Sequence, residues 1–449
     1  MKGLVGVPLG AIAVLMSPMA FAQAGPSLCE EGSNVQLIQT LVGNNGGGYN
    51  GEGNLASQTG IGGPYGGLAM DSLQRLHFTD FGTERVRRVE TDGTVNTVLG
   101  NGSSGFSADG TPALAASLNK VFGIAFDSAD TLHFVDGYNH RVRKIDAATQ
   151  TLVTVAGGGT LSPANGDGGP ATAVYLQYPA GIAFDSHGDL YFADRHHYSV
   201  RKVDSAGTIR TVVGNALNSN SFIPGQLAAN TAIGEINYLL FDSANNLYIA
   251  GSSPRVLKIA PGAGGVATGT VTLIAGNGTL GWSGDGGPAI DAAFSDYLSG
   301  LALDAYGHLF VSDYSNHRIR RVDALTGIVT TVVGTGASGF NADGIPALTA
   351  NLSYPNGLLF DDDGGIVFND YFSGRIRHFR ASCDPSQGLC PPQDTPEQCL
   401  APSLGSVFYI NVVGPAPGNL QRAIRCTVAA PGEAAVCDTL DLLDAQCGT

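Results

Sequence analysis

Beyond residue 24 the sequence has no apolar run that approaches the roughly 18 residues of a membrane-spanning helix. Basic residues are also scarce, because 23 Lys and Arg stand against 38 Asp and Glu and the formal net charge is −15. A chain with this balance repels a nucleic-acid backbone, and no basic stripe offsets the repulsion. We therefore expect a chain that has no membrane span and does not bind nucleic acid.

Cysteine is absent from the long middle of the chain. One cysteine lies near the start and the other six follow residue 380. The first residues combine a basic start at Lys2, an uncharged stretch over 4–19 and small residues at alternate positions from Ala20, which predicts a secretory signal peptide over 1–24. Export and clustered cysteine together predict disulfide bonds and a secreted or periplasmic location. The candidate cysteines are Cys29, Cys383, Cys390, Cys399, Cys426, Cys437 and Cys447.

The 64 glycines suit tight turns and short strands, and the sequence between the cysteines is a repeat. A five-residue apolar segment, which ends in Asp in five of its six copies, recurs at intervals of 56 to 62 residues. Repeats of this length indicate a solenoid, a propeller or a similar array. The copies are Leu76–Asp80, Leu132–Asp136, Leu190–Asp194, Leu247–Gly251, Leu309–Asp313 and Ile366–Asp370.

Each copy carries four short β-type runs separated by turn-forming residues. In the third copy they are 181–185, 190–194, 200–204 and 209–213. Such runs predict an antiparallel meander, and six four-stranded sheets can bury their faces by packing radially. We therefore predict an all-β fold, a six-bladed β-propeller over 35–380. Its Pro-Ala-x-x-Ala-x-Leu segments, at 112–118 and 346–352, should form helical turns over the blade junctions.

The two ends of the repeat region predict how the ring closes. The sixth copy stops at 375–379 and lacks a fourth strand, whereas 35–43 resembles a fourth strand but precedes the first copy. We predict that this N-terminal strand completes the last blade. Closure would place Cys29 and Cys383 on one face of that blade, where they could form a bridge; the alternative is three bridges within the tail and a free Cys29.

The tail over 381–449 is a separate Cys- and Pro-rich segment. It contains one convincing strand, Ser406 to Val413. A segment of this size with so small an apolar core needs covalent links to hold a shape. We expect its disulfide bonds to provide them.

Two stretches identify a family resemblance. Residues 139–144 and 316–321 read Asn-His-Arg-Val-Arg-Lys and Asn-His-Arg-Ile-Arg-Arg, and Gly-Asp-Gly-Gly-Pro-Ala occurs at 166–171 and 284–289. These stretches resemble NHL repeats of the kind found in bacterial secreted proteins and teneurin ectodomains, and the resemblance covers about 35–380. The resemblance implies a fold but not an activity, since one fold hosts many activities.

The strand order predicts where a ligand binds. If the first strand of each copy is innermost, the loops after the second and fourth strands emerge on one face, and the opposite face receives only tight turns. Longer loops usually carry binding residues, so we expect the site on this loop-rich face. The candidate residues are Asp136, Asp194, His196, His197, Trp282, Asp313 and His317.

The repeated Asp residues allow two interpretations. A ring of carboxylates around the axis would suit Ca²⁺. However, each of the five Asp residues has an Arg seven positions later, and the copy with Gly251 has Leu257 at that position. The fourth copy thus lacks the Asp and the Arg together. This joint loss favours a partly buried ion pair, because either residue alone would leave an unpaired charge. We therefore expect structural pairs and no cofactor, with Ca²⁺ as the alternative, and we expect His140 and His317 to be hydrogen-bonded within the loops.

The function indicated is binding rather than catalysis. No nucleophile elbow and no three histidines at a metal-ligand spacing occur in the repeats. We predict an exported scaffold that binds an extracytoplasmic protein or a glycan through the loop-rich face, where Trp282 could anchor a partner or sugar. The alternative, implied by the resemblance to propeller enzymes, is a metal-dependent lyase or a lactonase-like hydrolase with its site at the axial mouth.

Overall fold

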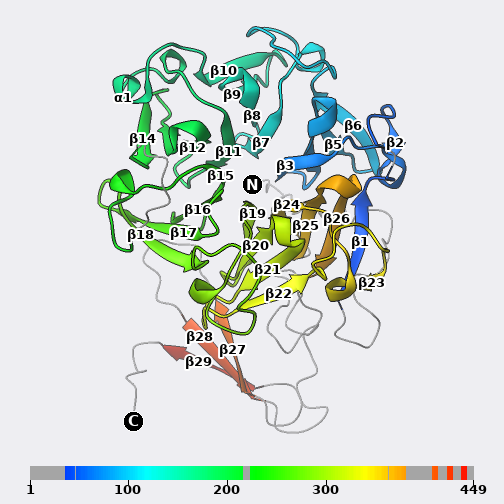
Figure 1. The fold of residues 1–449 in the computed structure, drawn as a ribbon, viewed down its shortest axis with the longest axis vertical. Coiled ribbons are helices and arrows are strands. Elements are labelled where there is room, and N and C mark those ends of the chain that lie inside the picture. The colour runs from blue at the N-terminus through cyan, green and yellow to red at the C-terminus, as the bar shows by residue number, and fades with distance from the viewer. Residues whose placement is uncertain are drawn as a thin grey trace, which may run out of the picture. The chain divides into compact units, whose positions relative to one another are not determined.

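The computed structural model describes residues 36–380 apart from 46, 216–222 and 363, together with the backbone of three strands after residue 406. Within 36–380 six sheets are arranged around a central axis (Figure 1), which confirms the predicted six-bladed propeller. Blade 1 contains β3 (Pro64–Met70), β4 (Leu76–Asp80), β5 (Arg85–Val89) and β6 (Thr94–Leu99); blade 2 contains β7 (Val121–Phe126), β8 (Leu132–Asp136), β9 (Arg141–Ile145) and β10 (Leu152–Gly157); blade 3 contains β11 (Pro179–Phe184), β12 (Leu190–Asp194), β13 (Ser199–Val203) and β14 (Ile209–Val213).

The second half of the ring repeats the same antiparallel meander. Blade 4 contains β15 (Ile236–Phe241), β16 (Leu247–Gly251), β17 (Val256–Gly262) and β18 (Gly265–Ala275); blade 5 contains β19 (Leu298–Leu303), β20 (Leu309–Asp313), β21 (Arg318–Val322) and β22 (Val329–Val333); blade 6 contains β24 (Pro355–Phe360), β25 (Gly365–Asp370), β26 (Arg375–Arg380) and, from the start of the chain, β1 (Leu37–Val42). The first strand of each blade, called the inner strand below, lies nearest the axis (Figure 1).

Strand β1 closes the ring as predicted. It pairs antiparallel with β26, with Ile38 opposite Phe379 and Thr40 opposite Arg377. Both Ile38 and Phe379 are fully buried, so the seam between the two ends of the chain carries part of the core.

Short helical turns connect the strands. One set follows the second strand of five blades, and its members are η2 (Phe81–Thr83), η4 (Gly137–Asn139), η6 (Arg195–His197), η9 (Tyr314–Asn316) and η11 (Tyr371–Ser373). The other set lies in the loops between blades, with α1 (Pro163–Gly166) in one of these loops, and its members are η1 (Ala56–Gln58), η3 (Ala113–Ala115), η5 (Ala171–Ala173), η7 (Ala228–Asn230), η8 (Ala289–Asp291) and η10 (Ala347–Thr349). The Pro-Ala segments thus form the helical turns that the sequence predicts.

The loops between blades also cover the outer edges of the sheets. Two of them add a short strand, β2 (Asn54–Leu55) beside β6 and β23 (Ile345–Pro346) beside β1. The other four make single bridges to the outermost strand, which are Pro112 with Thr151, Pro170 with Thr208, Leu227 with Thr270, and Pro288 with Ile328. Every outermost strand therefore has a partner on the side that would otherwise be a free edge.

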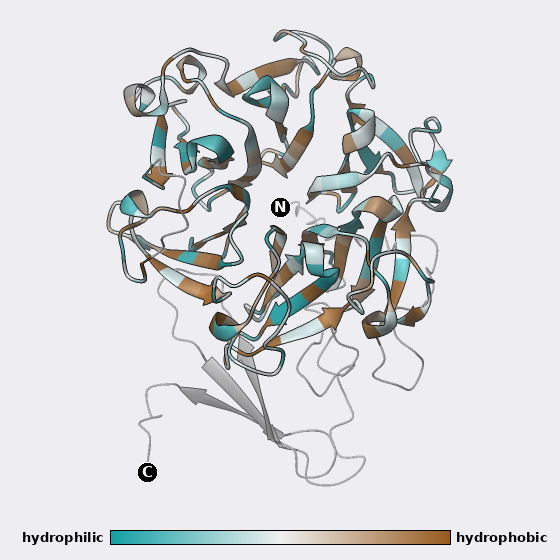
Figure 2. Ribbon diagram, viewed as in Figure 1, coloured by the Kyte–Doolittle hydropathy of each residue, from teal (hydrophilic) through white to brown (hydrophobic). Residues whose placement is uncertain are grey.

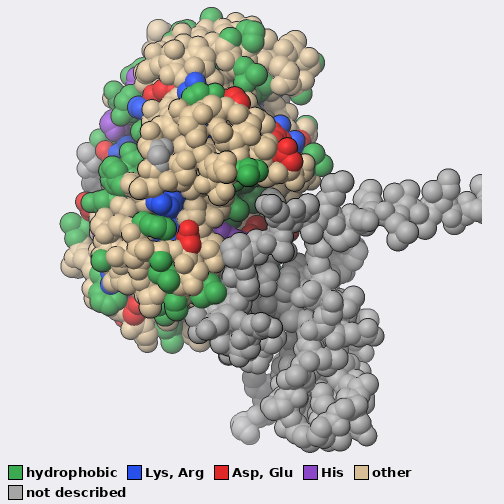
Figure 3. Space-filling model, turned by 90° about the vertical axis from the view of Figure 1, so that its right-hand side faces the viewer, with side chains coloured by type: hydrophobic (Ala, Val, Ile, Leu, Met, Phe, Trp, Pro, Cys, Tyr) green, Lys and Arg blue, Asp and Glu red, His purple; other side chains and the backbone are tan. Residues whose placement is uncertain are grey.

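Apolar residues recur along the strands of each blade (Figure 2) and form the core between neighbouring sheets. On the part of the propeller visible in Figure 3, charged side chains are scattered among polar and apolar atoms, in keeping with the absence of a basic stripe from the sequence. In the described part of the chain we find no helix with the length and hydropathy of a membrane span.

Residues Ser382–Thr449 form a second unit. Its described backbone is a three-stranded antiparallel sheet of β27 (Val407–Val412), β28 (Arg422–Thr427) and β29 (Val436–Asp441), in that order. The sequence predicted only the first of these strands, because arginines and aspartates interrupt the apolar pattern of the other two. Residues 1–24, Cys29, Cys383, Cys390, Cys399 and Cys447 lie outside the described residues, so the signal peptide and the disulfide bonds stay predictions.

Candidate functional site at the axial mouth

The five Asp–Arg pairs are ion pairs, as the sequence predicts. In each pair both side chains are fully buried, and the nearest carboxylate and guanidinium atoms lie 3.4 to 3.7 Å apart. The pairs are Asp80–Arg87, Asp136–Arg143, Asp194–Arg201, Asp313–Arg320 and Asp370–Arg377. In blade 4, Gly251 and Leu257 occupy the two positions and both are buried.

The same carboxylates also hold the loop that leads into each inner strand. One oxygen of Asp136 accepts a hydrogen bond from the backbone N–H of Asn119 at 2.9 Å, and Asp313 accepts one from Ser295 at 2.8 Å. Burial raises the pKa of Asp136 and of Asp313. These carboxylates therefore serve the framework of the loop-rich face, and in the described residues no three His, Cys, Asp or Glu side chains are grouped to hold a metal ion.

A second set of acids ties four of the loops between blades to the blade that follows each loop. Asp109 lies 2.9 Å from Arg143 and accepts the backbone N–H of Thr154 at 3.0 Å. The same contact to the buried Arg occurs at Asp167, Asp285 and Asp343 in blades 3, 5 and 6. Because each of these four buried Arg residues lies between two acids, the four loops have a fixed path over the face.

The candidate histidines occupy framework positions as well. His140 and His317 each accept, through Nδ1, the backbone N–H of a residue in the following blade, Tyr178 and Tyr354, at 3.2 Å. Burial lowers the pKa of both histidines, which favours the neutral ring that accepts this bond. His197 bonds Asp194 through Nδ1 at 2.9 Å.

Trp282 is the blade 5 member of a repeated contact. The guanidinium of Arg318 lies 4.1 Å from the centroid of its ring, and the Trp side chain is 46% exposed. Phe106 over Arg141 and Phe340 over Arg375 make the same contact at 4.4 and 3.8 Å. This repeated contact could have been predicted from the sequence, since each of the three aromatic residues follows a glycine at the same point of its loop. A binding role for Trp282 stays a prediction.

The most distinctive feature of the loop-rich face was missed by the sequence analysis. Aromatic side chains from blades 1, 2, 3, 5 and 6 surround the axis where the inner strands begin, and we call this group the aromatic mouth. Neighbouring rings contact one another with centroids 4.3 to 6.4 Å apart. Its members are Tyr65, Phe81, Phe122, Tyr138, Tyr178, Tyr297, Tyr314, Tyr354, Tyr371 and Phe372.

Six of these residues come from two positions of the repeat. Tyr178, Tyr297 and Tyr354 directly precede an inner strand, whereas Phe81, Tyr314 and Tyr371 directly follow the Asp that ends the second strand. Phe372 is 65% exposed and Tyr138 47% exposed, so the mouth presents apolar surface to solvent. The recurrence of aromatic residues at equivalent positions of the repeat could have indicated the aromatic mouth from the sequence.

Blade 4 interrupts the aromatic mouth with polar groups. Glu235 stands directly before inner strand β15, where blades 3, 5 and 6 have Tyr, and one of its carboxylate oxygens accepts two hydrogen bonds from Arg195 at 2.7 and 2.9 Å. His196 lies beside this pair, with Nε2 3.7 Å from Glu235 and its ring against Tyr178. Among the residues that the sequence proposed, His196 is thus one that lies at the mouth.

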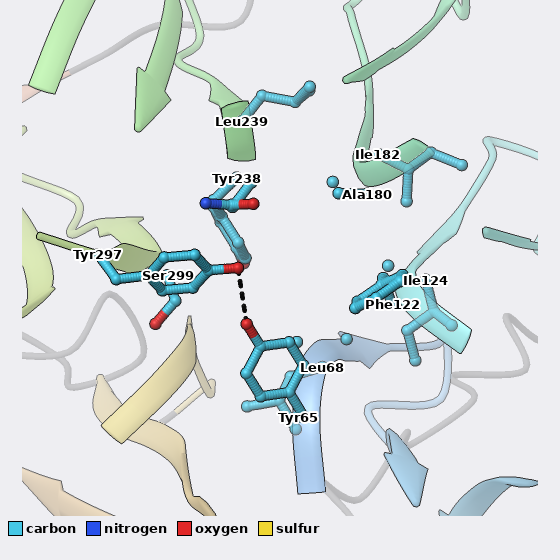
Figure 4. Close-up of a pocket in the computed structure, with 15 residues that line it drawn as sticks. Tyr65, Leu68, Phe122, Ile124, Ala180, Ile182, Tyr238, Leu239, Tyr297 and Ser299 are labelled. Atoms are coloured by element: carbon cyan, nitrogen blue, oxygen red, sulfur yellow. Dashed lines mark hydrogen bonds between the residues drawn. The ribbon is translucent and has the colours of Figure 1, made fainter. Parts of the chain in front are cut away.

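A small cavity lies on the axis, and a pair of tyrosines spans it. The hydroxyl groups of Tyr65, in the inner strand of blade 1, and Tyr297, directly before the inner strand of blade 5, are 2.7 Å apart (Figure 4). Burial raises the pKa of both hydroxyls, so both stay protonated. The cavity has a volume of about 40 Å³; Asn237 and Ser299 line it with polar groups, and apolar side chains line the rest.

Each inner strand also carries a branched aliphatic side chain that is at most 8% exposed and belongs to the core between blades. The six are Leu68, Ile124, Ile182, Leu239, Leu301 and Leu358. Four of them, Leu68, Ile124, Ile182 and Leu239, line the cavity and make much of its wall apolar.

Comparisons with known proteins agree with the fold. Residues 162–239 match the family model described as the Teneurin NHL domain. The chain is 28% identical over 274 residues to the protein SUPPRESSOR OF QUENCHING 1, chloroplastic, of Arabidopsis thaliana, and 27% identical over 288 residues to Teneurin-1 of Mus musculus. These alignments cover 59% and 57% of this chain but only 25% and 10% of the two relatives.

Two solved structures from Bacteroides thetaiotaomicron share the architecture. A protein of unknown function superposes with a TM-score of 0.57 at 19% identity, over 78% of this chain and 76% of that one. An auxiliary nutrient binding protein superposes with a TM-score of 0.56 at 19% identity, over 77% of this chain and 76% of that one. At this level of identity the likeness shows the fold.

Proposed function

Since this chain is an NHL-repeat β-propeller, we propose that it is an exported binding protein whose aromatic mouth takes a carbohydrate. A propeller fold hosts many functions, so the argument depends on the site. The observation that carries it is the aromatic mouth, whose series of rings is interrupted by the Arg195–Glu235 pair.

A carbohydrate matches both parts of this surface. The C–H face of a sugar ring is apolar and flat, so it packs on an aromatic ring, while its hydroxyl groups need donors and acceptors in fixed positions. Tyr138 and Phe372 offer exposed rings. Arg195 and Glu235 offer a donor and an acceptor that neutralise each other, which suits an uncharged ligand.

The comparisons support a binding role. One solved propeller with this architecture is described as an auxiliary nutrient binding protein. Export rests on the predicted signal peptide and is part of the proposal. The alternative of a metal-dependent lyase or lactonase-like hydrolase receives less support, because no group of three metal-ligating side chains was found among the described residues.

A glycan array probed with the purified mature protein tests this proposal, followed by calorimetric titration of the oligosaccharides that bind. We expect Tyr138→Ala to weaken binding at least tenfold. The matched control is Tyr306→Ala, because Tyr306 is 49% exposed but lies in a tight turn on the opposite face. If no oligosaccharide binds, or if both variants weaken binding equally, the proposal is wrong.

A further inference from the structure

The axial cavity contains buried polar atoms without partners. The side-chain Nδ2 and Oδ1 of Asn237 and the Oγ of Ser299 are inaccessible to solvent and make no hydrogen bond to the described residues. Both residues line the cavity, and Ser299 is 5% exposed. Buried polar groups are ordinarily satisfied, so three such atoms around one cavity indicate that something else supplies their partners.

These polar groups stand at a position that varies among the blades. At this position, the second residue of the inner strand, blades 1, 2 and 3 have Tyr65, Phe122 and Ala180, and blade 6 has Asn356, whose side chain accepts the backbone N–H of Gly66 at 2.7 Å. The cavity is thus polar on the side of blades 4 and 5, and apolar on the opposite side, where Phe122, Ile124, Ala180 and Ile182 lie (Figure 4).

The size and chemistry of the cavity specify a small uncharged group. A volume of about 40 Å³ has room for a substituent of a few heavy atoms and excludes a whole sugar ring. Asn237 offers one donor and one acceptor side by side, which a secondary amide matches with its own C=O and N–H. A methyl group next to that amide would meet the apolar wall. No charged side chain lines the cavity, so an ionised group would be buried without a partner.

We propose that the axial cavity is a subsite for the acetamido group of an N-acetylated sugar. This inference rests on the proposed carbohydrate-binding function and names the class of sugar. The amide of Asn237 pairs with the acetamido N–H and C=O, the Ser299 hydroxyl donates to the same C=O, and the methyl group packs against Ile124 and Ile182. Entry of the group separates the hydroxyls of Tyr65 and Tyr297, which then become available to the sugar hydroxyls.

Calorimetric titration with chitotetraose and cellotetraose tests the subsite, because these oligosaccharides share the β-1,4-linked backbone and differ at the acetamido groups. We expect the wild-type protein to bind chitotetraose at least tenfold more tightly. The variants Asn237→Ala and Ser299→Ala should each weaken the binding of chitotetraose and reduce this ratio to about threefold or less. Ser315→Ala is the control, because Ser315 is exposed in the loop after the second strand of blade 5.

The outcomes separate this inference from the function on which it rests. If the wild type binds both oligosaccharides equally, the acetamido subsite is wrong and carbohydrate binding is retained. If it binds neither, both proposals fail. Should Asn237→Ala unfold, the ratio measured with Ser299→Ala decides, and an unchanged ratio in that variant overturns the inference.

Discussion

The carboxylate of Asp370 lies 3.7 Å from the guanidinium of Arg377, and both side chains are fully buried in the blade that the two ends of the propeller build together. Arg377 also contacts the loop acid Asp343 at 3.1 Å. One buried cation therefore holds the second strand, the third strand and the crossing loop of the closing blade.

Removal of one partner of this pair should destabilise the propeller. We expect Arg377→Leu to lower the free energy of unfolding by about 3 to 5 kcal/mol, because Asp370 is left buried without a cation. The double variant Asp370→Gly, Arg377→Leu copies the pair of residues that blade 4 carries, Gly251 and Leu257, and should recover part of the loss. Urea denaturation of the wild type, Arg377→Leu, Asp370→Gly and the double variant measures the coupling energy between the two residues. If the effects of the two single substitutions simply add up in the double variant, the prediction is wrong.

Asp370 should also give the fold a dependence on pH. Burial raises the pKa of its carboxyl group to about 6 from an ordinary value of 3.8. A folded-state pKa above the unfolded one means that the native state binds the proton more tightly, so this group's contribution to stability is greatest below about pH 4 and is lost as pH rises towards 6. Denaturation at pH 4, 5, 6 and 7 should show a decline that is smaller in Asp370→Asn. Parallel curves for the two proteins would refute the assignment.

The hydrogen bonds by which His140 and His317 link one blade to the next should contribute measurably to the free energy of unfolding. His317→Ala removes the acceptor of the Tyr354 N–H bond, and we expect a loss of about 1 kcal/mol in the free energy of unfolding. His187→Ala serves as the control, since His187 is exposed in a tight turn of the opposite face. Equal effects of the two substitutions would show that the hydrogen bond between His317 and Tyr354 contributes nothing to stability.

The seam of the ring predicts a covalent link. Ile38 in β1 pairs with Phe379 in β26, so the chain enters and leaves the propeller side by side. Cys29 lies seven residues before Gln36, and Cys383 three residues after Arg380. We expect non-reducing peptide mapping to recover Cys29 linked to Cys383. A Cys29 peptide with a free thiol would instead support the alternative of three bridges within the tail.

The sequence predicted the ring because the repeat length, the short strands within each copy and the strand before the first copy all indicate the same four-stranded blade. Five copies with four strands, a sixth copy with three, and one additional strand before the first copy leave one way to bury the faces and close the seam. The Asp–Arg pairs were predictable for a related reason: blade 4 lacks both partners at once, so the sequence itself contains the double substitution that reveals a pairing.

The site could be predicted only in part. His196 was noticed because it departs from the repeat, and it does lie at the mouth beside Glu235. The aromatic mouth was missed because its rings come from several positions of the repeat and converge only when the blades are arranged around the axis. The orphaned groups of Asn237 and Ser299 could not be predicted, because burial without a partner is a property of packing and leaves no pattern in the sequence.

The origin of strand β1 has a consequence for biosynthesis. Because the last blade takes its outermost strand from the start of the chain, that strand must wait, exposed and unpaired, until β26 has been synthesised more than 300 residues later. The ring cannot close on a partly made chain. Translocation of an unfolded polypeptide before folding begins would suit this order, since the seam could then form only when both of its strands have reached the same compartment.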